Sequence, residues 1–94
     1  MNENQNHGII NVLGRDSVGI IARVCTFLSE SGVNILDISQ TIVGGFFSML
    51  MIVDLGTSSL SFDAIQSGLV KVGESLGVEV RLQRESIFDA MHRI

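Results

Sequence analysis

A glycine-flanked segment, Gly14-Arg15-Asp16-Ser17-Val18-Gly19, marks the point where the hydrophobic pattern of this 94-residue chain changes. The residues before it, Gly8–Leu13, form an apolar run that is typical of a β-strand. The residues after it, Ile20–Ser31, carry apolar side chains at the spacing of an amphipathic helix. The segment therefore predicts a loop that opens a helix. Backbone N–H groups and the helix dipole make such a place able to hold a small anion, for example a carboxylate.

The first predicted helix has one apolar face, and Gly32 follows it as a C-terminal stop. Residues at helical spacing make up that face: Val18, Ile21, Val24, Cys25 and Leu28. Ile20 and Phe27 fall at the border of the polar stripe, so we expect a second helix to lie alongside the first.

The remaining chain predicts three strands and two helices. In order they are a strand at Val33–Val43, a Gly44-Gly45 hairpin turn, a strand at Phe46–Leu55, a helix capped by Ser61 that ends at Gly77, a strand at Val78–Arg84 and a short helix at Ser86–Ile94. The second helix contains Gly68 and Gly73, which close backbone packing would explain.

This order predicts an α+β, ferredoxin-like βαββαβ sandwich, in which a four-stranded antiparallel sheet carries two helices on one face, plus the short C-terminal helix. Residues 1–6 are polar and predict a flexible N-terminus, and residues 7–94 predict a single domain. The strand at 46–55 is apolar on both faces, although helices cover only one. The terminal helix, a second copy or both must cover the other face. We therefore expect a homodimer.

Composition excludes several classes of protein. The net charge of −4 argues against direct nucleic-acid binding. The single cysteine, Cys25, cannot form an internal disulfide and predicts a buried, reduced thiol, which favours a cytoplasmic location. The N-terminus lacks the pattern of a secretory signal, and no apolar run is long enough to span a membrane. His7 and His92 have no Cys/His cluster near them, so we expect no metal site and no cofactor.

The chain resembles the ACT domain. The resemblance rests on Gly14–Ala22 before the first helix and on Gly32–Ile38 after it, and it extends from about His7 to Ile94. The segments Asn34–Thr41 and Ile87–Met91 are similar to the small standalone ACT proteins of bacteria, and more distantly to the ACT repeats of the glycine cleavage repressor. The resemblance implies a regulatory module that binds an amino acid or another small ligand, often between paired domains, and controls an enzyme or a transcription factor.

Carried over onto this sequence, the resemblance implies two groups of ligand-binding residues. They are the loop residues Asp16, Ser17, Val18 and Gly19, and the strand residues Asn34 and Ile35. Backbone N–H groups near Gly19 would take a carboxylate, and Asp16 or Asn34 would orient the amine. The family often has proline where this chain has Val18, which restores one N–H donor.

Simpler interpretations stay open at each of these positions. Gly14 and Gly19 can be turn residues, Asp16 can be a helix cap, and Asn34 can belong to a turn. The function likewise has alternatives: a dimerising adaptor without a ligand, or a small ferredoxin-like enzyme. We expect no catalytic residue and no enzyme activity. The few chemical candidates, Arg15, Asp16 and Asp37, form no evident acid, base or anion clamp.

Overall fold

The computed structural model describes residues 6–15 and 18–84. Its elements follow the predicted order: β1 (His7–Arg15), α1 (Val18–Glu30), β2 (Asn34–Val43), β3 (Phe46–Asp54), the short 3-10 helix η1 (Leu55–Thr57), α2 (Phe62–Leu76) and β4 (Glu79–Arg84). The predicted helix at 86–94 and most of the predicted flexible N-terminus lie outside the described residues. The domain boundaries at residues 6 and 94 stay predictions.

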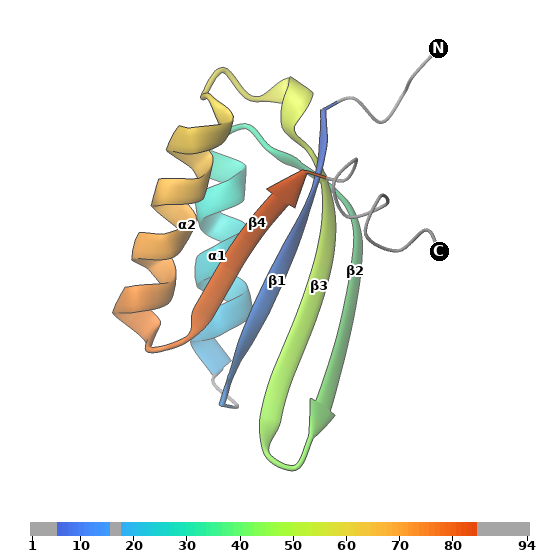
Figure 1. The fold of residues 1–94 in the computed structure, drawn as a ribbon, viewed down its shortest axis with the longest axis vertical. Helices are drawn as coiled ribbons and strands as arrows, with labels where there is room; N and C mark the ends of the chain where they lie inside the picture. Colours follow the sequence, from blue (N-terminus) through green and yellow to red (C-terminus); the bar gives the residue numbers. More distant parts are fainter. Residues whose placement is uncertain (1–5, 16–17, 85–94) are drawn as a thin grey trace.

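The four strands form one antiparallel sheet in the order β2-β3-β1-β4. Both long helices pack on the same face of this sheet (Figure 1). Gly44 and Gly45 connect β2 to β3 with φ of 58° and 85°, the left-handed pair that a tight two-residue hairpin requires. The ferredoxin-like sandwich is therefore confirmed.

The core lies between the sheet and the two helices. Alternate residues of β3 point into it, and so do Ile10 and Val12 of β1. The prediction for the inward face of α1 was wrong at Ile21 and Cys25. Ile20 is fully buried, whereas Ile21 and Cys25 are only partly buried. The burial of Ile20 agrees with its expected place beside a second helix, because α2 lies alongside α1.

Two glycines inside α2 let neighbouring groups approach its backbone. A Cβ atom on Gly68 would lie 2.2 Å from Cζ of Phe27, which confirms that Phe27 meets the second helix. A Cβ atom on Gly73 would lie 2.7 Å from the carbonyl oxygen of Val78. Each glycine weakens the helix by about 1 kcal/mol relative to alanine, and close packing explains why both are retained.

The outer strand β2 is irregular and exposed. Its pairing with β3 shifts between Ile35 and Asp37, so Leu36 leaves the face that the sequence pattern had assigned to it together with Ile38 and Ile42. Apart from the partly buried Ile35, every residue of β2 is exposed. In Figure 1 both helices lie toward the β4 edge of the sheet, and most of β2 stays exposed.

Candidate functional site

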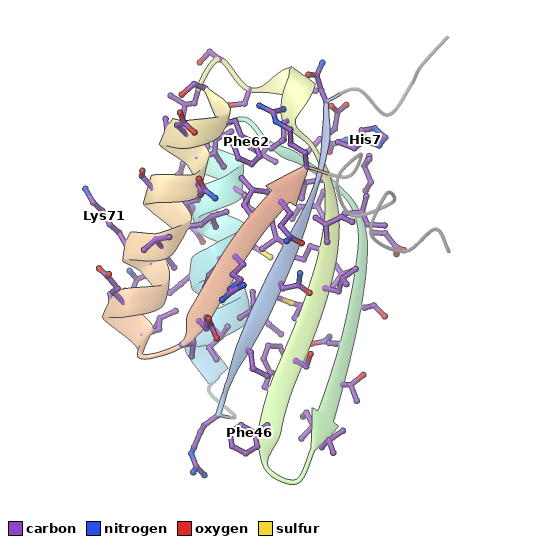
Figure 2. The ribbon with its side chains drawn as sticks, in the orientation of Figure 1. His7, Phe46, Phe62 and Lys71 are labelled. Atoms are coloured by element: carbon purple, nitrogen blue, oxygen red, sulfur yellow. The ribbon has the colours of Figure 1, made fainter. Side chains whose placement is uncertain are left out.

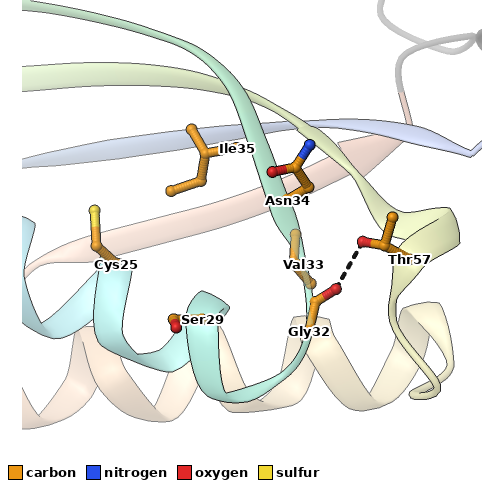
Figure 3. Close-up of a pocket in the computed structure, with 7 residues that line it drawn as sticks. All are labelled: Cys25, Ser29, Gly32, Val33, Asn34, Ile35 and Thr57. Atoms are coloured by element: carbon orange, nitrogen blue, oxygen red, sulfur yellow. Dashed lines mark hydrogen bonds between the residues drawn. The ribbon is translucent and has the colours of Figure 1, made fainter.

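A hollow of about 570 Å³ opens where α1 ends and β2 begins. This volume falls in the usual range of small-molecule sites. Three elements line it (Figure 3): α1 contributes Cys25 and Ser29, the turn and β2 contribute Gly32, Val33, Asn34 and Ile35, and η1 contributes Thr57. A pocket built from three elements can hold a guest against several backbone segments at once.

The rim of this pocket is held by hydrogen bonds across the chain. Gly32 ends α1 with φ of 77°, and the N–H of Val33 then donates to the carbonyl of Leu28 at 2.9 Å. The hydroxyl of Thr57 donates to the carbonyl of Gly32 at 2.7 Å (Figure 3). Ser58 likewise donates its hydroxyl to the carbonyl of Ser31. The turn after α1 is therefore fixed by η1, which follows β3 in the chain.

The polar groups that face the pocket are uncharged, and Val33 and Ile35 add apolar surface to its lining. The hydroxyl of Ser29 and the amide of Asn34 make no hydrogen bond to the residues that the structure describes, so both can serve a guest. The thiol of Cys25 projects from α1 toward β2 (Figure 3). Cys25 is partly exposed, so the prediction of a buried thiol was wrong: the face of α1 that bears it lies over the little-covered strand β2.

Comparison with known proteins identifies the family. The family model of the ACT domain matches residues 7–83. This chain belongs to the ACT domain family. A UPF0237 protein of Bifidobacterium longum is 55% identical over 89 residues, which cover 95% of this chain and 99% of that protein.

Solved structures agree with this assignment. An ACT domain protein from Streptococcus pneumoniae superposes with a TM-score of 0.78 at 35% identity, covering 92% of this chain and 97% of that one. A putative glycine cleavage system transcriptional repressor has a TM-score of 0.73 at 24% identity, covering 83% of this chain and 44% of that one, and it shares the fold. Both resemblances inferred from the sequence are confirmed.

The predicted ligand residues of this ACT domain fall into two places. Asn34 and Ile35 line the pocket. Gly19 lies in the first turn of α1, at the opposite end of that 13-residue helix. A helix of this length separates its ends by roughly 20 Å, farther than a small amino acid can bridge. Within one chain the two groups therefore do not meet.

The other loop residues are described only in part. Asp16 and Ser17 lie outside the described residues, and Val18 is the first residue of α1. The two flanking glycines differ in what the fold requires of them. A Cβ atom on Gly14 would lie 2.4 Å from Cγ1 of Val78, so Gly14 serves packing. A Cβ atom on Gly19 would meet nothing within 4 Å, so packing does not explain that glycine.

Sequence reasoning missed most of the pocket. Cys25 and Ser29 are one helical turn apart on the side of α1 that faces β2, a signal that the i, i+4 spacing contained. Thr57 had no such signal, because it reaches the pocket only through the path of β3 and η1.

Residues 6–15 and 18–84 contain neither a cluster of metal ligands nor a membrane-spanning helix. No group of three or more His, Cys, Asp or Glu residues in this part of the chain could hold a metal ion. Neither described helix is long and apolar enough to cross a membrane.

Proposed function

We propose that this ACT domain is a regulatory module that binds a small amino acid between two copies of the chain. The observation that carries the proposal is the separation of the two predicted ligand groups, one at each end of α1, beside an exposed edge strand. A second copy is the simplest way to bring such groups together. The repressor that shares this fold supports a regulatory role, and control of an enzyme or a transcription factor is part of the proposal.

The β2 edge is suited to pairing with a second copy. Four of the eight large apolar side chains exposed among the described residues belong to it: Leu36, Ile38, Ile42 and Val43. Asp37 is its one charged residue. An edge strand also presents backbone N–H and C=O groups without strand partners. Two β2 strands related by a twofold axis would pair these groups and bury the apolar side chains.

Such pairing would complete the ligand site. Antiparallel alignment places the start of one β2 beside the end of the other. The end of β2 lies at the same end of the sheet as the start of α1, because Val43 pairs with Phe46 and Phe46 pairs with Arg15. The pocket at Asn34 of one copy would therefore face the first turn of α1 in its partner.

The chemistry of the two halves suits a zwitterion. The start of α1 offers N–H groups and the positive end of the helix dipole to a carboxylate. The carbonyl oxygen of the Asn34 amide can accept from an ammonium group, and the hydroxyl of Ser29 can accept or donate. The pocket has no charged lining residue that would demand a further charge on the ligand. Ile35 and Cys25 border the space in which the side chain of a bound amino acid would lie, which favours a ligand with a small side chain.

The test combines mass and binding on the same protein. We expect sedimentation velocity to give the mass of a dimer at micromolar concentration, and calorimetry to give heat with at least one of the twenty amino acids at millimolar concentration. A dimer that binds none of them would leave the ligand-free adaptor as the function. A monomer at every concentration would contradict the proposal. A cytoplasmic location and the absence of direct nucleic-acid contact belong to the same proposal.

A further inference from the structure

Two residues of β1 on the same face of the sheet differ sharply in exposure. Ile9 and Leu13 both point away from the helices, because the alternate residues Ile10 and Val12 point into the core. Leu13 is 50% exposed, as expected for an uncovered face, but Ile9 is only 3% exposed. Something excludes water from one end of this face and not from the other.

The described elements do not account for the burial of Ile9. Both helices lie on the opposite side of the sheet (Figure 1). Its strand neighbours on the same face are Ile52 of β3 and Gln83 of β4. Both are themselves partly exposed, so they flank Ile9 without covering it.

The chain leaves the sheet next to this covered end. β4 ends at Arg84, which pairs with Gly8, the residue before Ile9. Residues 85–94 follow, and their apolar residues recur at helical steps: Ile87, Phe88, Met91 and Ile94. Eight helical residues extend about 12 Å, enough to cross two strand spacings of about 4.8 Å. The other terminal segment, residues 1–5, has Met1 as its one apolar residue.

We propose that residues 85–94 fold back in the same chain and cover the Ile9 end of the open sheet face. This inference is independent of any ligand. Figure 2 shows His7 near the Ile9 end of the sheet and Phe46 at the opposite end. At that opposite end Leu13, Val43 and Phe46 stay exposed. With the tail in place, a second copy cannot stack over the Ile9 end, and the β2 edge stays free for pairing.

Nuclear Overhauser spectra of the full chain test the contact directly. We expect cross-peaks between the δ1 methyl of Ile9 and the ring of Phe88. A filtered spectrum of mixed labelled and unlabelled protein separates contacts within a chain from contacts between chains. The proposal requires the cross-peaks to be absent from the filtered spectrum. Cross-peaks only in that spectrum would place the tail of a second copy on Ile9, and no cross-peak in either would leave Ile9 covered by another segment; both results overturn the proposal.

A pair of tail variants supplies an independent readout. Phe88→Asn removes an apolar contact, while Asp89→Asn changes the adjacent residue on the polar side of the predicted helix. We expect Phe88→Asn to raise the equilibrium constant of unfolding in urea about tenfold and to shift the Ile9 methyl resonance. Asp89→Asn should leave that resonance in place. Equal effects of the two variants, or an unmoved Ile9 resonance in both, would contradict the docking.

Discussion

The two edges of the sheet differ in length, charge and cover. β4 has six residues, three of them charged, and α2 packs against it through Gly73. β2 has ten residues with one charge, and it is exposed along nearly its whole length. Short, charged and covered edges resist pairing with other chains, whereas long apolar edges promote it. The difference indicates that β2 is the edge at which this domain assembles.

The assignment of β2 as the assembly edge is tested most strongly by placing a charge on that strand. Ile38 lies near the middle of β2, so a twofold axis through the paired strands would bring both copies of a lysine close together. We expect Ile38→Lys to raise the dimer dissociation constant at least about 100-fold, because it removes apolar burial and places like charges side by side. Sedimentation velocity over a concentration series measures the constant.

The chain offers a matched control beside the other edge. Val70 of α2 borders β4 and is exposed to the same degree as Ile38, at 42% and 41%. Val70→Lys should leave the dimer constant unchanged. If Val70→Lys weakens the dimer and Ile38→Lys does not, assembly uses the β4 side.

The packing of α2 against β4 can be tested by adding a methyl group at Gly73, where the two elements come close together. A Cβ atom there would also lie 3.0 Å from Cγ2 of Val80, so Gly73→Ala forces α2 away from β4. We expect the free energy of unfolding to fall by about 1–3 kcal/mol, against the gain in helix propensity. Urea denaturation measures it. An unchanged or higher stability would show that α2 does not pack tightly on this edge.

The pocket at the start of β2 predicts a smaller, specific effect. Asn34→Ala should weaken amino-acid binding about tenfold, the value of roughly one hydrogen bond to a charged group. Because Asn34 is exposed, the free energy of unfolding should stay within about 0.5 kcal/mol of the parent. Calorimetry and urea denaturation give the two numbers. Loss of stability equal to the loss of binding would point to a turn role for Asn34.

A substitution at Gly19 should change stability by a small amount, with a sign opposite to that expected at Gly73. Since a Cβ atom there meets nothing within 4 Å, Gly19→Ala should raise the free energy of unfolding by up to about 1 kcal/mol. Thermal or urea unfolding measures the gain. A destabilised variant would mean that the start of α1 needs this glycine for its own conformation.

Most of the fold could be predicted from local signals. Gly32, Gly44, Gly45 and Gly77 end or reverse elements where the sequence places them, and each has positive φ. Ser61 accepts from the N–H of Ala64 and caps α2 as expected. These signals depend on neighbours within a few residues, which is why single-sequence reasoning finds them.

The parts that failed depend on contacts between distant segments. Ile21 and Cys25 were predicted on the buried face of α1 but are only partly buried, because the spacing within one helix cannot show how fully its neighbours cover it. Leu36 left its expected face because the bulge in β2 is set by pairing with β3. Of the pocket residues, only Asn34 and Ile35 were predicted as ligand contacts, since Thr57 joins them through tertiary structure alone. The loop residues Asp16 and Ser17, together with Val18 and Gly19, stay predicted ligand contacts.

The central claim is that each ligand site combines the start of α1 from one copy with Asn34 from its partner. Mixing two variants tests it most directly: Gly19→Leu, which fills the approach to the helix start, and Asn34→Ala. Each alone should bind the amino acid found by calorimetry weakly or not at all. After subunit exchange the account predicts binding restored at about a quarter of the sites, those with both native halves in a mixed dimer. A mixture that binds no better than its components would contradict the claim.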